Sequence, residues 1–322
     1  MLISSPQYGN LHLLPLDNDI AGNHWPPGSS AYYCEKDFGT IVIRKYNAGQ
    51  FRIQYVLVNL IRTISFLFKE EKPQVRNRLV LEGDFWMKTK DRQKQQIKSG
   101  QLLLLHAGDR EETLHFEKEG QYVFLDTMYS DAFLQPLLSS FPSLAPFIHH
   151  APSAKEQRKI RGPRFALPET TRIAQNLLQC PYDPGLRRLY FEIKMKDYLF
   201  QSFILAQKSG KKVNKLQQEE QEAVYMAHRI ILSDITRHIT IKDISGQVRL
   251  NEKKLKRSFK QVYGMGVYEC LLQARMERAR ELLLTTDKPI KEIASLCGFD
   301  YLTNFATAFR RYFGDTPGDL RN

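Results

Sequence analysis

The sequence is poor in cysteine and contains no long uninterrupted apolar run. Its four cysteines are scattered over 322 residues without a C-x-x-C pair, so neither a disulfide framework nor a thiolate zinc site is expected. The most apolar windows, residues 55–68 and 101–105, are too short or too interrupted by polar side chains for a transmembrane helix. The first residues do not lead from a basic stretch into an apolar run, as a signal peptide would. These absences predict a cytoplasmic protein with reduced thiols and no membrane partner.

Motifs of common catalytic sites are also absent. The sequence holds no G-x-S-x-G, no P-loop and no glycine-rich dinucleotide-binding run. His106 and His115 lack the H-x-H element of a cupin metal site, and His149 and His150 stand beside Ala and Pro. We therefore expect no metal ion, no other cofactor and no catalytic activity. A metal-dependent cupin-type enzyme with a nucleic-acid-binding tether stays open as an alternative.

Acidic residues are fewer than basic ones, and the imbalance is uneven along the chain. The formal net charge is +12 and the pI is near 9.4, which predicts a polyanionic partner. The net charge is zero over residues 1–150, +9 over residues 151–218 and +3 over residues 219–322. The first of these segments therefore does not look like a nucleic-acid-binding surface.

Residues 1–150 are predicted to form a β-rich domain. Residues 1–35 lack periodicity, and we expect an irregular lead-in there. From residue 39 to about residue 125, turn residues separate strand-length runs such as TIVIRKY, FRIQYVLVNL, RLVLEGDFWMKT, QLLLLHAG and GQYVFLDTMY. This spacing favours an antiparallel sheet or a barrel-like sandwich. A helix is expected to start at Asp131.

Residues 151–218 are predicted to be a basic linker and a helical connector. The linker, residues 153–165, is basic and interrupted by Gly and Pro. Apolar residues at helical spacing then predict one helix that starts at Pro168 and a second over Leu186–Gln207. We expect these two helices to pack as a hairpin.

Residues 219–322 contain two similar units. Each opens with Ile-Lys, an acidic residue, Ile and a small residue, continues through a short turn, and ends in Phe before a basic residue. In the first unit, Thr240 and Asp243 resemble a capping box, and Asn251 is a good N-cap. In the second, Pro289 fits the first helical position, and Asp300 is expected to cap a helix that begins near Tyr301.

A predicted helix over residues 267–284 connects these units. A single unit is also compatible with a plain helical hairpin, but two units with a fixed connection predict a double helix-turn-helix. Such a pair contacts successive segments of the major groove, about 34 Å apart.

These residues carry a resemblance to AraC/XylS-type transcription regulators. The matching pattern is Gly264, Tyr268, Leu271, Arg275, Met276, Ala279, Leu283, Ile290, Ile293, Ala294, Gly298, Phe299, Phe305, Phe309, Gly314, Thr316, Pro317 and Arg321. The resemblance implies a DNA-binding domain of seven helices over residues 219–322, with one reading helix in each unit. It also implies double-stranded DNA as a partner and, as further expectations, contact with RNA polymerase, a homodimer and a role as an activator.

Carried over by position, the resemblance also implies which side chains contact DNA. The first reading helix is expected to present Lys253, Lys256 and Arg257 to base edges or nearby phosphates, and the second to present Leu302, Thr303, Asn304 and Thr307. Phosphate contacts are expected for Lys254, Lys260, Arg310 and Arg311. Two positions depart from the family pattern. Thr307 stands where a basic residue is frequent, so the second unit is expected to read bases weakly and mainly to position the protein on DNA. Arg249 stands where Gly is common in the first turn. Core packing is expected for Leu255, Phe259, Ile293, Ala294, Phe305 and Phe309.

The β-rich domain resembles, in texture, the cupin-like effector domains of the same family. The candidates to line an effector pocket are Arg44, Tyr46, Tyr55, Phe85 and Trp86, although half-buried strand residues that only pack look the same. Residues 189–199 are similar to the connecting helix of a subgroup that includes regulators of ferric-siderophore uptake. A ferric siderophore is therefore one expected effector, beside sugars, aromatic acids and no ligand at all.

The expected fold class is α+β, with a β-rich cupin-like N-terminal domain, a helical connector and an all-α domain with two helix-turn-helix units. The expected function is that of a ligand-responsive, sequence-specific DNA-binding transcription regulator. A nonspecific architectural DNA binder is a further alternative, and it predicts steep salt dependence with little sequence preference.

Overall fold

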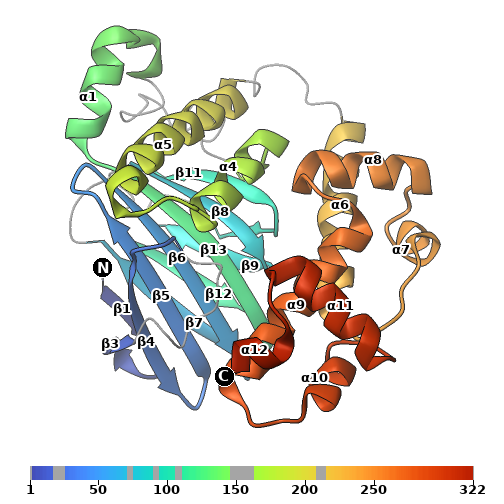
Figure 1. Ribbon diagram of the computed structural model, residues 1–322. Coiled ribbons are helices and arrows are strands. Elements are labelled where there is room, and N and C mark those ends of the chain that lie inside the picture. The colour runs from blue at the N-terminus through green and yellow to red at the C-terminus, as the bar shows by residue number, and fades with distance from the viewer. Residues whose placement is uncertain are drawn as a thin grey trace. The chain divides into compact units, whose positions relative to one another are not determined.

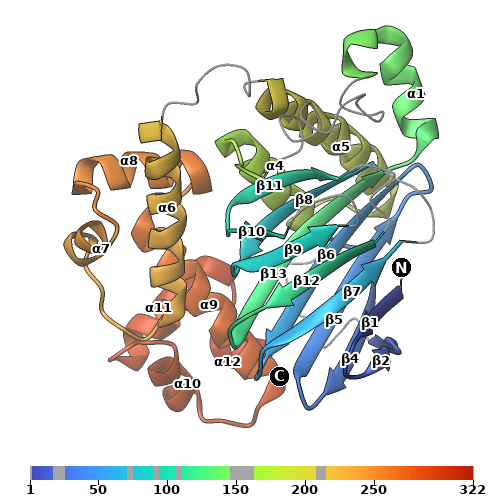
Figure 2. The same cartoon turned by 180° about the vertical axis from the view of Figure 1, so that it is seen from behind.

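The computed structural model describes residues 2–16, 26–70, 75–89, 94–105, 111–145, 163–207 and 215–321. The chain divides into an N-terminal unit that ends at Lys215 and a C-terminal unit that begins at Leu216, and both are drawn in Figures 1 and 2. His106, His149 and His150 lie outside the described residues. None of the described helices has the length and apolarity that crossing a bilayer requires.

Two antiparallel sheets form the N-terminal unit. The order of the eight-stranded sheet is β14-β11-β8-β13-β6-β5-β4-β3, and that of the six-stranded sheet is β10-β9-β12-β7-β1-β2. The first sheet comprises β3 (Leu14–Leu16), β4 (Ser30–Lys36), β5 (Gly39–Asn47), β6 (Phe51–Leu60), β8 (Val75–Glu82), β11 (Gln101–Leu105), β13 (Gly120–Tyr129) and β14 (Arg164–Phe165). The second comprises β1 (Leu2–Ser5), β2 (Gly9–Asn10), β7 (Ile64–Lys69), β9 (Phe85–Thr89), β10 (Gln95–Ile97) and β12 (Glu111–Phe116). The predicted antiparallel β-rich domain is confirmed.

The prediction of an irregular lead-in over residues 1–35 is wrong where the structure describes this segment. It contains β1, β2 and β3, and β4 begins within it. β1 pairs with β7, more than fifty residues further along the chain, and β4 pairs with β5 over seven residues. Short strands of this kind are fixed by the partner strand, because pairing and burial outweigh intrinsic strand preference. Their own sequence therefore carries little signal.

Alternation along the strands gives the eight-stranded sheet two apolar faces. On the inner face, Val56 and Phe124 pack with Phe66 of the six-stranded sheet in one core. On the outer face, Ile53 and Leu79 belong to a second core that includes the helices of the connector. The eight-stranded sheet is thus covered on both faces.

A buried ionic network joins the two sheets. Arg76, Arg78 and Asp126 come from β8 and β13 of one sheet, and Glu112 comes from β12 of the other; none is more than 4% exposed. Arg78 donates to Asp126 from Nε at 2.8 Å and from Nη2 at 2.7 Å, and the same Nη2 lies 2.8 Å from Glu112. Arg76 Nη2 lies 3.0 Å from Glu112. Burial alone would lower the pKa of Arg78, but the two carboxylates raise it, so the side chain stays protonated.

Helices cover the outer face of the eight-stranded sheet, as Figure 1 shows for α4 and α5. The helical elements of this unit are α1 (Asp131–Ser140), the 3-10 helix η2 (Pro142–Leu144), α4 (Pro168–Leu178) and α5 (Pro184–Gln207). The helices expected from Asp131, from Pro168 and over Leu186–Gln207 are therefore present. α5 is tied to the sheet because Ser202 Oγ accepts a hydrogen bond from Asn77 Nδ2 at 2.9 Å. The segment predicted as linker also supplies β14, which pairs with β11.

Seven helices form the described part of the C-terminal unit, as the resemblance implied. They are α6 (Lys215–Ser233), α7 (Ile241–Gln247), α8 (Glu252–Tyr263), α9 (Val267–Thr285), α10 (Ile290–Leu296), α11 (Leu302–Phe313) and α12 (Pro317–Arg321). All residues expected in its core are buried, including Leu255, Ile293 and Phe309. The four cysteines of the chain are free and buried, and burial raises the pKa of Cys270 to about 12 and that of Cys297 to about 11.

Candidate DNA-binding interface

Two equivalent helix pairs form the candidate interface. α7 and α10 have 7 residues each, and α8 and α11 have 12 residues each. α8 and α11 both end at a glycine in the left-handed region, Gly264 with φ 74° and Gly314 with φ 91°. Glycine ends a helix there without the steric cost that other residues meet. The predicted double helix-turn-helix is confirmed.

Capping side chains set where two of these helices, α7 and α8, begin. The backbone nitrogen of Asp243 donates to Thr240 Oγ1, and that of Thr240 donates to the Asp243 carboxylate, which is the predicted capping box. Asn251 accepts from the backbone nitrogen of Lys254 at 2.8 Å, as an N-cap does. The prediction for Asp300 is wrong. α11 begins one residue later than expected, its N-cap is Tyr301, and no side chain caps it.

The turns of the two units have the same backbone conformation with different residues. Arg249 has φ 56° in the first turn, and Gly298 has φ 78° in the second. Arg249 is the one residue other than glycine with positive φ among the described residues. The departure from glycine noted in the sequence therefore leaves the turn geometry in place, and it introduces a conformation that costs an L-residue about 1–2 kcal/mol.

α8 presents a basic face opposite its buried face. Lys253, Lys256, Arg257 and Lys260 are exposed, whereas Leu255 and Phe259 on the other side are fully buried. The remaining predicted contact, Lys254, lies on the flank of the helix. Its Nζ lies 3.0 Å from the Glu220 carboxylate of α6. Sequence reasoning did not identify Glu220, because the contact joins residues 34 positions apart.

α11 presents a more neutral face. The predicted contacts Leu302, Thr303, Asn304, Thr307, Arg310 and Arg311 are all exposed, and Phe305 and Phe309 on the opposite side are buried. Thr307 Oγ1 donates to the carbonyl of Thr303 at 2.8 Å, so this hydroxyl is already engaged within the helix. The basic residues of α11 are concentrated in its last turn. The two reading helices thus differ in the charge they offer to DNA.

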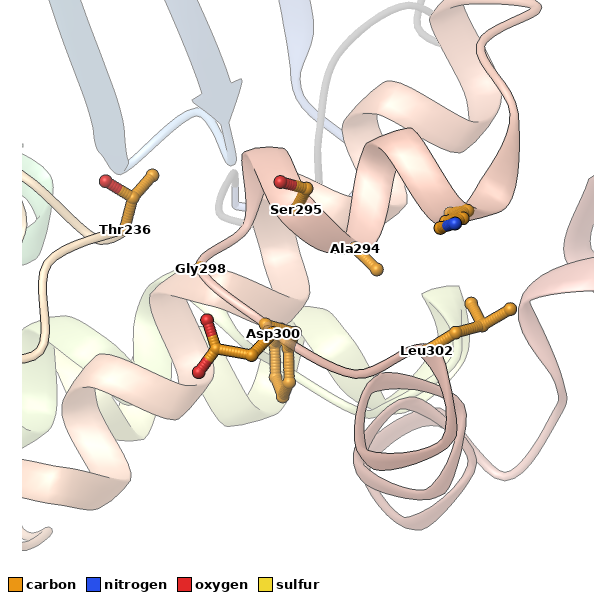
Figure 3. Close-up of a pocket in the computed structure, with 8 residues that line it drawn as sticks. Thr236, Ala294, Ser295, Gly298, Asp300 and Leu302 are labelled. Carbon is orange, nitrogen blue, oxygen red and sulfur yellow. The ribbon is translucent and has the colours of Figure 1, made fainter.

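Arg275 of α9 holds the second turn in place. Its Nε donates to the carbonyl of Ile235 at 2.7 Å in the segment between α6 and α7, and its guanidinium lies 5.5 Å from the centre of the Phe299 ring. A cavity of about 370 Å³ lies beside this turn, and Figure 3 shows residues of α10, the turn and the start of α11 around it. The residues lining it are Thr236, Lys291, Ala294, Ser295, Gly298, Phe299, Asp300 and Leu302.

Comparison with protein families accounts for both units. Residues 244–322 match the family described as a helix-turn-helix domain, and residues 56–213 match the regulatory protein PchR N-terminal domain. The chain belongs to the AraC/XylS-type transcription regulators. The β-rich N-terminal unit and the helical C-terminal unit confirm the predicted fold class of this AraC-type chain.

Relatives of the AraC-type chain match it over parts of its length. The HTH-type transcriptional regulator ArgR of Pseudomonas aeruginosa is 34% identical over 90 residues, which cover 28% of this chain and 27% of the relative. The transcriptional activator NphR of a Rhodococcus species is 26% identical over 202 residues, which cover 55% of this chain and 59% of the relative. The C-terminal domain of the response regulator yesN from Fusobacterium nucleatum is 34% identical with a TM-score of 0.30, and the match covers 31% of this chain and 99% of that structure. The chain thus spans between 27% and 59% of these two curated relatives.

The five residues expected to line an effector pocket of the AraC-type chain do not converge. Arg44, Tyr46 and Tyr55 share the outer face of the eight-stranded sheet, where Tyr46 packs against Phe191 of α5 with ring centres 4.7 Å apart. Phe85 lies in the core between the sheets. Trp86 follows it on β9, faces the opposite way and lies beneath the Lys94 ammonium.

His115, one of the two histidines considered for a metal site, contacts a serine hydroxyl. The Nδ1 atom of His115 lies 2.7 Å from the Ser65 hydroxyl. Among the described residues, no three His, Cys, Asp or Glu side chains are placed to share a metal ion. His106 is not among these residues.

Proposed function

We propose that this protein is a sequence-specific, DNA-binding transcription regulator that reads two successive segments of the major groove. The observation that carries the proposal is the pair of equivalent 12-residue helices α8 and α11, each buried on one face and exposed on the other. α9 connects their units with 19 residues, which correspond to about 28 Å of helix at 1.5 Å per residue. This length is comparable to the roughly 34 Å that separate successive turns of the major groove.

The exposed side chains support different tasks in the two reading helices. On α8, Arg257 and Lys253 suit guanine edges, because their donors match the O6 and N7 acceptors of guanine. On α11, Asn304 suits adenine, while Leu302 and Thr303 suit thymine methyl groups. The phosphate contacts are proposed for Lys256, Lys260, Arg310 and Arg311, which are exposed on the same helices.

Replacing Arg257 with alanine tests base reading. We expect the variant to lose about 1–3 kcal/mol of discrimination at one base pair, because a bidentate guanine contact disappears. The matched variant Lys260→Ala should weaken binding to all duplexes alike and reduce the slope of log K against log salt by about 0.9. Affinities would be measured by fluorescence anisotropy on a site that the full chain selects from random duplexes, and on a scrambled duplex. Equal losses on every duplex for both variants would contradict the assignment, and selection of no site would favour an architectural binder.

The N-terminal unit is proposed to sense a small molecule, with no catalytic activity. The match of residues 56–213 to a regulatory N-terminal domain supports this. Arg44, Tyr46 and Tyr55 are the proposed contacts, because they share one sheet face beneath α5. A ferric siderophore, a sugar or an aromatic acid remains the proposed effector class, and activation through RNA polymerase in the cytoplasm the proposed outcome. DNA affinity that none of these ligands changes would remove the support for sensing.

A homodimer is proposed through the exposed face of α5. An apolar stripe of Leu186, Leu189, Ile193 and Phe200 lies on this face, and each of these side chains is 56–57% exposed. The spacing of three, four and seven residues is that of a heptad seam. The opposite face, with Phe191 and Met195, is buried on the sheet. The stripe is therefore available to the same helix of a second copy.

The substitution Ile193→Glu tests this interface. We expect it to weaken self-association at least about tenfold, because a carboxylate would be buried at the centre of an apolar seam. Sedimentation equilibrium of the full chain measures the effect. Gln201→Glu adds the same charge to the same helix outside the stripe and should leave the equilibrium unchanged. Equal behaviour of the two variants would exclude the stripe as the interface.

A further inference from the structure

Glu220 of α6 contacts three side chains of the first reading helix. Ser258 Oγ donates a hydrogen bond to Glu220 Oε1. Lys254 Nζ lies 3.0 Å from Oε2, and Arg257 Nη2 lies 3.8 Å from Oε1. Burial alone would raise the pKa of Glu220, but the hydrogen bonds from Ser258 and Lys254 and the charges of Lys254 and Arg257 outweigh it and lower the pKa. The carboxylate is therefore a fixed negative charge at the flank of α8.

The two cations of this cluster are held differently. The Lys254 side chain is 32% exposed and makes a close ion pair with Glu220. The Arg257 side chain is 66% exposed, and only one of its nitrogens comes near Glu220, at 3.8 Å. Arg257 thus keeps donors of its planar guanidinium free to point away from the protein, whereas the single ammonium of Lys254 is engaged. Both residues were expected to contact DNA. The Glu220 carboxylate engages the Lys254 ammonium but leaves most of the Arg257 guanidinium exposed.

We propose that Glu220 is a positioning residue for DNA reading, which orients Arg257 toward a base edge and withholds Lys254 from the phosphates. The inference rests on the proposed function, since it concerns how the reader separates specific from nonspecific DNA. Its two effects act in the same direction. An arginine held in one orientation loses less rotamer freedom when it binds a base. A lysine engaged by an internal carboxylate contributes less to phosphate binding, which supplies the affinity for nonspecific DNA.

The substitution Glu220→Gln separates these effects from folding. Glutamine keeps an oxygen that accepts from Ser258 but removes the charge that holds Lys254 and Arg257. Full-length protein would first select a site from random duplexes of about 30 base pairs, a length that exceeds two major-groove segments. Wild type and variant would then be measured by fluorescence anisotropy on that site, on its single-base variants and on a scrambled duplex, over a range of salt concentrations.

Glu220→Gln is expected to raise the affinity for nonspecific DNA and to lower the discrimination between base pairs. Affinity for the scrambled duplex should rise about threefold, and the slope of log K against log salt should steepen by about 0.9, because Lys254 becomes free to contact a phosphate. Discrimination at the base pair read by Arg257 should fall about tenfold. In the Arg257→Ala background the same substitution should no longer change discrimination, because the group that it positions is gone.

Controls distinguish this role from a structural one. Glu219→Gln makes the same charge change at an exposed position of the same helix, and it should leave discrimination at that base pair intact. If Glu220→Gln lowers the unfolding temperature and weakens all duplexes equally, its role is structural and the inference fails. If wild type selects a site and Glu220→Gln reads it equally well, the inference alone fails. If wild type selects no site, the proposed function fails first.

Discussion

Substitution of Asp126 by alanine is expected to lower the free energy of unfolding of the N-terminal unit by about 3–5 kcal/mol. Asp126 is fully buried and accepts two hydrogen bonds from Arg78, at 2.8 and 2.7 Å. Without it, Arg76 and Arg78 would share Glu112 as the one carboxylate of the network. A buried cation that loses its partner keeps the cost of desolvation without the compensating attraction. Urea unfolding followed by far-UV circular dichroism measures the loss.

A double substitution tests whether charge or shape causes this loss. Arg78→Met combined with Asp126→Leu removes both members of the bidentate pair and keeps most of the apolar volume between the sheets. Because replacing a buried ion pair by apolar residues is often nearly neutral, the double variant should recover much of the stability that Asp126→Ala loses. A single variant as stable as wild type would show that the pair contributes little. A double variant less stable than the single one would show that the rest of the network depends on it.

The C-terminal unit could be predicted from its sequence because its signals are local. The capping box of Thr240 and Asp243 lies within four residues, and Asn251 caps the helix that follows it directly. The repeat of these signals along the chain indicated the double helix-turn-helix. The error at Asp300 has a local origin as well. The second unit has six residues between Gly298 of the turn and Phe305, the first buried residue of its helix, whereas the first unit has five between Arg249 and Leu255, so the helix begins at Leu302.

The parts that the sequence did not predict depend on distant residues. Arg78 and Asp126 are 48 positions apart and meet only because β8 and β13 are neighbours in register. Glu220 reaches Ser258 across 38 positions. The five effector candidates lie on different faces for another reason. Phe85 and Trp86 are consecutive on one strand and must face opposite sides of the sheet, a constraint that the two-residue period of a strand already contains.

Gly298→Ala is expected to destabilise the C-terminal unit by about 2–4 kcal/mol, which combines left-handed strain with overpacking. Gly298 has φ 78°, and a Cβ atom there would lie 2.8 Å from Thr236 Cα and 2.9 Å from the carbonyl oxygen of Ile235. Both are backbone atoms, and Arg275 fixes that segment through its 2.7 Å hydrogen bond to the same carbonyl. The turn therefore has no room to yield, and α11 would lose its position for DNA.

The matched substitution at the first turn, Arg249→Gly, should relieve backbone strain instead of adding it. Arg249 already adopts φ 56°, so Arg249→Gly relieves about 1–2 kcal/mol of strain and adds about 0.5–1 kcal/mol of chain entropy to the unfolded state. Its net effect should therefore lie between no change and a stabilisation of about 1.5 kcal/mol. Thermal unfolding of the full chain, with anisotropy on its selected site, measures both variants. Gly298→Ala with wild-type stability and affinity would mean that the second turn tolerates displacement, and that close packing of Gly298 on the segment before α7 does not fix the second reading helix.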